Sequence, residues 1–433
     1  MRTTITHAGA DNLKYEIREI VEVARKIESF GQPIIWENIG DPIEKGEFLP
    51  EWIKKHIQEA LAEDAVYGYS PTMGLKETRE YIAHERNLEG GIQISTDDVL
   101  FFNGLGDAIS RVYRSLHGNA RVIGPNPAYP THSSAEAAHA DSPHITYALD
   151  PYNGWRPDLV EMERKVSENP QITGILIVNP DNPTGRVYAP RVMADIVSIA
   201  KKYDLFIISD EIYSNLVYDV PYKKLASVIG DVPGIAMRGI SKEFPWPGAR
   251  CGWVEFYNRE KDPDFYAYTQ SLIDLKMLEV CSTTLPQRLI PTVMKDGRYF
   301  PYLAARNKKY KKMAGIVHEI LSPVPELIVH KPQGAFYMTV VFKEGVLNSG
   351  QTLPIKNKEA AKLVDSLAEG CTELDKRFVY HLLGATGICV VPLKTGFNST
   401  YDGFRLTLLD PNEETFRKNI EMIRDSIVAF LAS

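Results

Sequence analysis

The residues ITGILIVNPDNPTG, at positions 172–185, decide the kind of fold that this chain adopts. Their first half is almost wholly apolar, which predicts a strand buried on both faces of a sheet, and their second half is rich in turn-forming residues. Two later segments have the same form: Leu205–Ser209 leads into Asp210, and Ile235–Ile240 leads into Ser241 and Lys242. Repeated strands of this kind with helical stretches between them predict a mostly parallel sheet covered by helices.

The flanking sequence predicts two further strands, Ala120–Gly124 and Cys251–Phe256, and the helices Ala189–Tyr203 and Asp262–Glu279. Beyond Asp296 the pattern changes to one long amphipathic helix, then short strands, then a last helix: Arg298–Leu321, Phe336–Val341, Gly387–Val391, Phe404–Leu408 and Glu413–Leu431. The expected fold class is α/β, with a three-layer α/β/α large domain and a smaller α+β domain.

A chain of 433 residues is too long for one compact core, so two domains are expected. We place the large domain at residues 61–300, and the interdomain helix with the C-terminal small domain at residues 301–433. Residues 1–60 are assigned to the small domain. The helix expected at Asn12–Ser29 could pack with either part.

The amino-acid composition limits the kinds of partner and the cellular location that can be expected for this protein. The net charge is −7, from 49 basic and 56 acidic side chains, which argues against nucleic acid or an anionic membrane. The N-terminus has no apolar stretch typical of a secretory signal, and no apolar run approaches the roughly 18 residues of a membrane span. The four cysteines are far apart, which suits neither a disulfide framework nor a metal site and predicts buried, reduced thiols in a cytoplasmic protein.

Polar side chains follow three successive strands of the expected sheet: Asn182 the first, Asp210 and Tyr213 the second, and Lys242 the third. Each has an ordinary explanation when taken alone: a turn, a helix cap or a solvated surface lysine. Ligands of such sheets bind beyond the carboxyl ends of the strands, however. Their joint order therefore predicts a binding site.

The segment SKEFPWPGARCG, at residues 241–252, resembles the S-K-x-F-x-x-x-G-x-R-x-G signature of the fold-type I pyridoxal phosphate-dependent aminotransferases of class I/II, the aspartate aminotransferase family. Further matches are NPDNPTG at 179–185, DEIY at 210–213 and FRL at 404–406. The resemblance runs from about residue 35 to the C-terminus and implies pyridoxal 5′-phosphate as cofactor.

The resemblance also implies roles around the cofactor ring. Lys242 would hold the cofactor as a Schiff base and, once displaced by substrate, carry a proton. Asp210 would keep the ring nitrogen protonated, because a nearby carboxylate raises its pKa. Asn182 and Tyr213 would donate to the phenolate oxygen, and Tyr129 would stack on the ring.

The cofactor's phosphate needs several donors. The turn Gly104, Leu105 and Gly106, before the helical pattern at 107–116, would offer backbone amides at a helix N-terminus, that of Asp107 included. Arg250 would clamp the phosphate. Relatives commonly carry a phosphate-binding serine where this chain has Gly239, so either Ser241 takes over as donor or that donor is missing. Tyr69 would reach the phosphate of the neighbouring subunit, with Thr283 or Thr284 as a further contact, which implies a homodimer with shared active sites.

Arg405 would grip the substrate's α-carboxylate, assisted by the backbone of Gly40 and by Asn182. The leading hypothesis is a ping-pong aminotransferase with 2-oxoglutarate or pyruvate as acceptor. A C–S β-lyase or β-decarboxylase on the same scaffold stays open, because both start from the same carbanion. A regulator with an aminotransferase-like domain would need a DNA-binding module, which this chain lacks room for. Trp246 has no functional role in these readings and is expected to pack.

Overall fold

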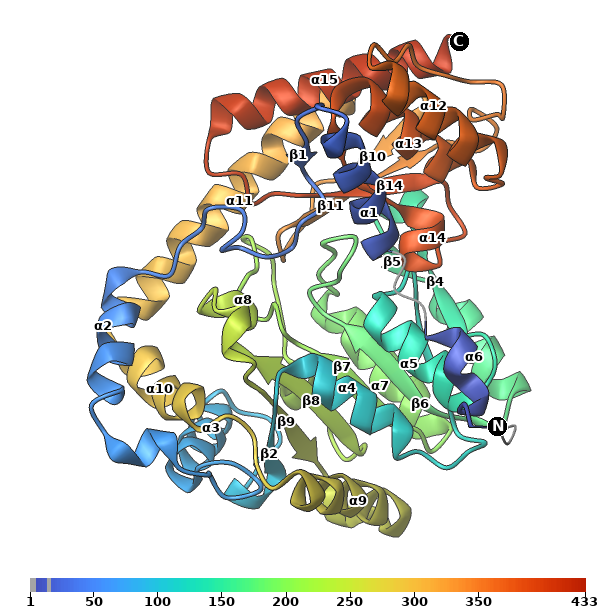
Figure 1. The fold of residues 1–433 in the computed structure, drawn as a ribbon. Helices are drawn as coiled ribbons and strands as arrows, with labels where there is room; N and C mark the ends of the chain where they lie inside the picture. Colours follow the sequence, from blue (N-terminus) through green and yellow to red (C-terminus); the bar gives the residue numbers. More distant parts are fainter. Residues whose placement is uncertain (1–4, 14–16) are drawn as a thin grey trace.

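The computed structural model describes residues 5–13 and 17–433. Its central element is an eight-stranded sheet (Figure 1). The spatial order of its strands is β2 (Val99–Phe102), β9 (Gly252–Tyr257), β8 (Gly234–Gly239), β7 (Phe206–Asp210), β6 (Ile172–Val178), β3 (Arg121–Asn126), β4 (Thr146–Asp150) and β5 (Arg156–Pro157). Only β9 and β5 run against the others, so the expectation of a mostly parallel sheet is confirmed.

Both faces of this sheet are covered, which explains why its strands are apolar at every position. Along β6, Leu176 and Val178 pack on the side of α4 and α9, whereas Ile175 and Ile177 pack on the side of α7. The helices on the first side are α4 (Leu105–Arg114), α5 (Pro130–Ala140) and α9 (Pro263–Glu279), and those on the second are α6 (Leu159–Glu168) and α7 (Pro190–Lys202). The sequence therefore builds three layers.

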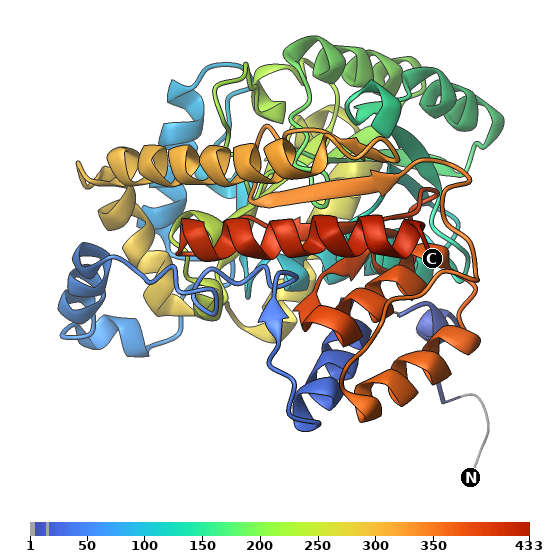
Figure 2. The same ribbon diagram turned by 90° about the horizontal axis from the view of Figure 1, so that it is seen from above.

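A second, antiparallel sheet lies in the C-terminal part of the chain, with the order β10 (Leu327–Val329), β11 (Tyr337–Phe342), β14 (Gly403–Thr407) and β13 (Val391–Pro392). The helices around it are α11 (Tyr299–Leu321), α12 (Lys358–Glu369), α13 (Leu374–Thr386), α14 (Leu393–Phe397) and α15 (Glu413–Leu431). Figure 2 shows α11 and α15 side by side. α11 also reaches from this sheet towards the large one (Figure 1).

The N-terminal segment contacts both parts of the molecule. β1 (Ile35–Trp36) pairs in parallel with β12 (Ile388–Cys389), and α1 (Ile17–Ser29) lies near β12. α2 (Glu51–Ala60) and α3 (Lys76–Leu88) instead pack on α10 (Thr284–Lys295). Short elements complete the chain: α8 (Ile240–Glu243), η1 (Ala8–Asn12), η2 (Asp64–Tyr67), η3 (Thr96–Asp98), η4 (Pro151–Asn153), η5 (Leu225–Ser227), η6 (Pro247–Ala249) and η7 (Arg259–Lys261).

Most expected elements agree with the structure to within one or two residues, and β6 and α15 agree at both ends. The strand expected at Gly387–Val391 is instead two short strands that pair with different partners. The helix expected at Asn12–Ser29 begins at Ile17, and residues 14–16 of that expectation lie outside the described residues. The division of the chain near residue 300 stays a prediction.

The expectations about membrane spans and cysteines can be compared with the structure. In the described ranges, no helix is both long and apolar enough to cross a membrane. The cysteines are all unpaired, but only Cys251 and Cys389 are buried. The expectation that all the thiols are buried was wrong for Cys281 and Cys371, which are partly exposed.

Candidate active site

A cavity of about 190 Å³ lies at the carboxyl ends of β6, β7 and β8. Its lining includes nine of the residues that the sequence singled out: Leu105, Gly106, Tyr129, Asn182, Asp210, Tyr213, Ser241, Lys242 and Arg250. These residues come from widely separated parts of the chain. The parallel sheet brings them together because its strands end at one edge.

Lys242 lies in the single helical turn α8, directly after β8. Its Nζ donates to the carbonyl oxygen of Gly40 at 2.8 Å. A Cβ at Gly40 would overlap the Tyr337 hydroxyl, so a larger residue there would have to displace that side chain. The carbonyl oxygens of Lys242 and Glu243 accept hydrogen bonds of 2.7 and 3.0 Å from one Nη of Arg306, a buried residue of α11. The backbone that carries the lysine is thus held by a helix distant in sequence.

Asp210 ends β7 and is buried. Its Oδ2 lies 3.2 Å from Nε2 of His132, and its Oδ1 accepts from the Ile212 amide at 3.1 Å. Nδ1 of His132 lies 3.2 Å from the Tyr113 hydroxyl, whose pKa is held well above its usual value by burial. With that hydroxyl donating to Nδ1, the Nε2–H of His132 donates to Asp210.

The sequence interpretation missed His132 and Tyr113. His132 is fully buried on α5, and its ring meets that of Tyr129 edge to face at 6.2 Å. The available signal was the helical spacing, since His132 comes three residues after Tyr129 and therefore lies on the same side of the helix. Nothing in the local sequence pairs either residue with Asp210.

Asn182 and Tyr213 point into the cavity from neighbouring loops. The Oδ1 of Asn182 accepts from an Nη of Arg405 at 3.3 Å, which leaves the amide nitrogen as its donor. In this structure the Tyr213 hydroxyl donates to that of Tyr337 at 3.4 Å. Burial raises the pKa of Tyr213 well above its usual value, so its hydroxyl stays protonated and acts as a donor.

Donors gather at the end of the cavity formed by the N-terminus of α4. Gly104 caps this helix with φ +82°, and a Cβ on it would lie 2.5 Å from the guanidinium of Arg250. Among the described residues, the backbone amides of Leu105 and Gly106 have no acceptor, whereas that of Asp107 donates to the Gly104 carbonyl at 3.2 Å. The site therefore offers two free amides and a guanidinium to an anion.

The structure gives a reason for Gly239. It pairs with Gly252 across β8 and β9, and a Cβ on it would lie 2.9 Å from the carbonyl oxygen of Cys251. A serine there would push the two strands apart. Ser241 does line the cavity, and its role as replacement donor stays a prediction. Trp246 is half-buried against the core, in agreement with packing.

Arg405, on β14, is buried close to the cavity. One Nη donates to the Asn38 carbonyl at 2.6 Å. Within the described part of the chain, its Nε has no hydrogen-bond partner. A buried guanidinium with an unused donor is suited to an anionic ligand.

The remaining predicted residues lie outside the cavity. Tyr69 is 87% exposed. The Thr283 hydroxyl donates to Oδ1 of Asn103 at 3.0 Å, and the Thr284 hydroxyl donates to the Gly68 carbonyl at 2.7 Å. Both hydroxyl protons are thus used within the chain.

Comparisons with known proteins agree with this geometry. The family model for aminotransferase class I and II matches residues 34–419. An uncharacterized aminotransferase of Methanocaldococcus jannaschii is 50% identical over the full length of both chains. The glutamate-pyruvate aminotransferase of Escherichia coli K12 is 27% identical over 76% of this chain and 80% of its own. An alanine aminotransferase structure from Pyrococcus furiosus superposes with a TM-score of 0.84, at 26% identity and 99% coverage of both chains.

Proposed function

The chain belongs to the class I and II aminotransferases, a pyridoxal 5′-phosphate-dependent family, and we propose that it moves amino groups from an L-amino acid to a 2-oxo acid by a ping-pong cycle on Lys242. The observation that carries the proposal is the single cavity that unites Lys242, Asp210, Asn182 and Arg250, with Arg405 hydrogen-bonded to Asn182.

The residues present fit the cofactor. Its phosphate would bind the free amides of Leu105 and Gly106 and the guanidinium of Arg250, since a Cβ at Gly104 would block the approach of that arginine. Asp210, held by His132, would face the ring nitrogen. When bound, pyridoxal 5′-phosphate supplies an aldehyde that reacts with amines and a ring that withdraws electrons from the substrate's Cα.

The protein's own residues would supply the proton transfers. Lys242 would bind the cofactor covalently and, when released, its Nζ would take the proton from the substrate's Cα. Gly40, whose carbonyl accepts from Nζ, would orient that amine. Tyr213, kept protonated by burial, and the amide of Asn182 would donate to the ring oxygen.

Arg405 would bind the α-carboxylate through the Nε that the protein leaves unused. This contact is common to amino acids and 2-oxo acids, so the same residue would serve both halves of the cycle. The names of the relatives in Mycobacterium tuberculosis and Escherichia coli, alanine aminotransferase and glutamate-pyruvate aminotransferase, support alanine with 2-oxoglutarate as the first pair to assay. The products would be pyruvate and glutamate.

The test is the absorbance spectrum of the purified holoenzyme before and after addition of single amino acids without an oxo acid. Loss of the yellow band, with release of the matching 2-oxo acid and one amino group retained per site, is the expected result. A persistent band with ammonia and an oxo acid accumulating would instead indicate a β-lyase, and release of carbon dioxide a β-decarboxylase. Lys242→Ala is the control and should show neither the band nor turnover.

The homodimer with shared sites and the cytoplasmic location belong to the same proposal. The 87% exposure of Tyr69 supports the dimer, because a tyrosine that serves a neighbouring subunit must project from its own.

A further inference from the structure

A lysine with a fully buried side chain lies behind the phosphate end of the cavity. Lys276, near the end of α9, has 0% of its side chain exposed. Its Nζ donates to Ser282 Oγ at 2.9 Å and lies 3.0 Å from a carboxylate oxygen of Glu279 and 3.7 Å from one of Asp107. Burial of a charged amine is costly, so a lysine in this position has to be paired.

The carboxylate of Asp107 occupies the first turn of α4, the helix whose N-terminus faces the cavity. Its Oδ2 accepts from the backbone amide of Asn103 at 3.1 Å, and its Oδ1 accepts from Nε of Arg111 at 2.7 Å. The positive end of a helix attracts anions, and here it would have to hold both this carboxylate and a phosphate. The two anions would repel each other unless the carboxylate is neutralised.

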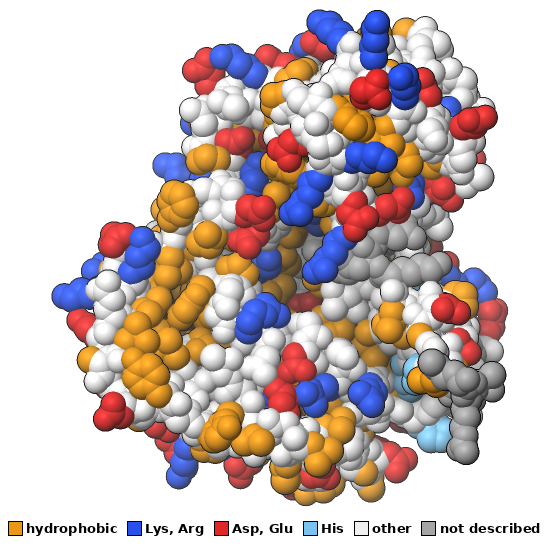
Figure 3. All heavy atoms as spheres, viewed as in Figure 1, with side chains coloured by type: hydrophobic (Ala, Val, Ile, Leu, Met, Phe, Trp, Pro, Cys, Tyr) orange, Lys and Arg blue, Asp and Glu red, His pale blue; other side chains and the backbone are white. Residues whose placement is uncertain are grey.

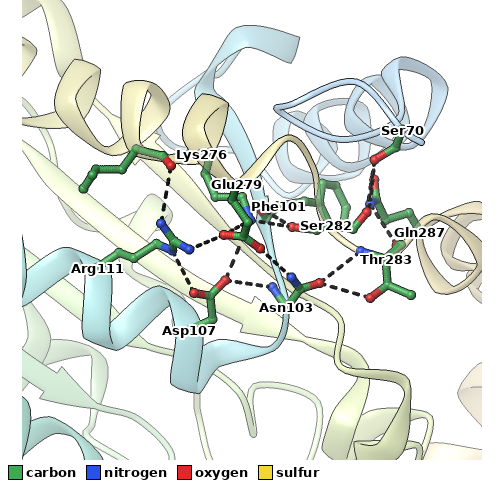
Figure 4. Close-up of polar contacts among 11 residues, drawn as sticks. Ser70, Phe101, Asn103, Asp107, Arg111, Lys276, Glu279, Ser282, Thr283 and Gln287 are labelled. Carbon is green, nitrogen blue, oxygen red and sulfur yellow. Dashed lines mark hydrogen bonds and ion pairs between the residues drawn. The ribbon is translucent and has the colours of Figure 1, made fainter.

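Figure 4 shows how the neutralisation is arranged, with Asp107, Arg111, Glu279 and Asn103 meeting at the start of α4. Glu279 accepts from Asn103 Nδ2 and from Arg111. Together with Lys276, the cluster holds two carboxylates and two cations. Without Lys276 it would carry one net negative charge next to the phosphate-binding turn.

Lys276 also contributes to the geometry of that turn. Ser282, which accepts from Nζ, donates to the carbonyl oxygen of Phe101 at 3.0 Å, in the strand that leads into Gly104. The Oδ1 of Asn103 accepts from the amide of Thr283 at 3.0 Å. The lysine therefore holds the segment before the turn and the acidic group within it.

We propose that Lys276 is a positioning residue for the cofactor's phosphate: together with Arg111 it neutralises Asp107 and Glu279 and so lets the N-terminus of α4 accept a dianion. This inference rests on the proposed function, since it assigns the phosphate to that turn. It concerns a residue that does not touch the cofactor and acts through Asp107.

The test compares two ligands that differ only in the phosphate. Apoenzyme is titrated with pyridoxal 5′-phosphate and with pyridoxal, and binding is followed by protein fluorescence. Lys276→Met should weaken pyridoxal 5′-phosphate binding about tenfold or more, because it leaves one uncompensated negative charge beside the phosphate. It should change pyridoxal binding by less than about twofold. Lys201→Met, at a lysine 63% exposed on α7, removes the same charge elsewhere and should change neither.

A second variant keeps the proposal testable if Lys276→Met does not fold. Glu279→Gln removes a carboxylate from a partly exposed position and should tighten pyridoxal 5′-phosphate binding, the opposite sign to Lys276→Met. The double variant should bind like the wild type, because its charges balance again.

Equal losses for both ligands, no loss for either, or weaker phosphate binding in Glu279→Gln would overturn the proposal. These results differ from a failure of the proposed function. In that case the wild-type apoenzyme itself would not bind pyridoxal 5′-phosphate, or would not prefer it to pyridoxal.

Discussion

Arg405 illustrates how single side chains are prepared for their ligands in this protein. Its guanidinium carbon lies 4.3 Å from the centre of the Tyr337 ring and 5.0 Å from that of Phe397. Two rings at these distances favour a planar cation, and the hydrogen bond to Asn38 fixes its rotation. The planar fork is therefore oriented before any carboxylate arrives.

We predict that Arg405→Lys raises KM for the amino acid and for the 2-oxo acid by about ten- to a hundredfold, because an ammonium loses the two-point contact. Steady-state kinetics with each substrate varied in turn measures this effect. Cofactor affinity should stay within about twofold of wild type, since the fork lies away from the phosphate end. Unchanged KM values would remove Arg405 as the carboxylate contact.

At the scale of elements, the loops at the strand ends are held by buried groups of their own. In the turn after β6, Asp181 is buried and its Oδ2 accepts from the amide and the hydroxyl of Thr184. Its Oδ1 has no partner within residues 5–13 and 17–433. Burial, above all, raises the pKa of Asp181 to about 7.

This pKa implies a dependence of stability on pH. Because the folded-state pKa lies above the unfolded value near 3.8, the stabilisation is complete below the lower value and is lost as pH rises towards 7, by about 1.4 kcal/mol per pH unit. Asp181→Asn removes this titration. Its thermal midpoint relative to wild type should therefore rise between pH 5 and pH 8 in the apoenzyme. A constant difference across that range would contradict the assignment.

A second connection between elements involves α11, α8 and the loop before α2. Arg306 of α11 pairs with Glu47 at 3.0 Å, and the same guanidinium donates to the Lys242 carbonyl. Tyr310 adds a hydrogen bond to Glu47. The pair is almost fully buried, with side chains 3% and 10% exposed. Arg306 therefore binds both the loop that carries Gly40 and the turn that carries Lys242.

We expect Glu47→Gln to destabilise the protein by about 3–5 kcal/mol, since it leaves a buried guanidinium without its counter-charge. It should also lower kcat, because Arg306 would shift and move the Lys242 backbone with it. Thermal unfolding and steady-state kinetics test the two parts. Glu51→Gln, at an exposed surface pair with Lys54, is the matched control and should cost about 0–1 kcal/mol.

For the molecule as a whole, the arrangement of exposed hydrophobic side chains bears on its assembly. Figure 3 shows hydrophobic side chains gathered over α2 and α10. Large hydrophobic residues with more than half of their surface exposed include Phe48, Tyr67, Tyr69 and Phe300, which lie in the chain before or after these two helices. Such a surface is expected to be covered by another protein surface, which supports the proposed dimer.

The proposed sharing of active sites between subunits leads to a prediction about mixed dimers. A homodimer of Tyr69→Phe should bind the cofactor more weakly at both sites. A homodimer of Lys242→Ala should have no turnover at either site. In mixed dimers, one site combines the intact Lys242 of the first chain with the intact Tyr69 of the second, and wild-type cofactor affinity should return at that site. The affinity of the restored site is measured by mixing the two apoproteins under conditions that allow subunit exchange and then titrating activity against cofactor. No recovery would mean that Tyr69 serves its own subunit or none.

The layered fold and most of the candidate site follow from the order of residues along the chain. Buried parallel strands must be apolar throughout, and each polar residue at a strand end then lies at one edge of the sheet, so Asn182, Asp210 and Lys242 could be grouped without coordinates. Arg250 and Arg405 were identified by resemblance, through short motifs around them.

The groups that support these residues could be identified only from the way in which the elements pack together. His132 beside Asp210, Arg306 beneath Lys242 and Lys276 behind α4 come from elements far away in the chain, and no local pattern marks them. Burying a polar or charged group requires a partner wherever the packing provides one. Hydrophobic periodicity sets which face of an element is buried, but the partner of each buried polar group depends on how the elements finally pack.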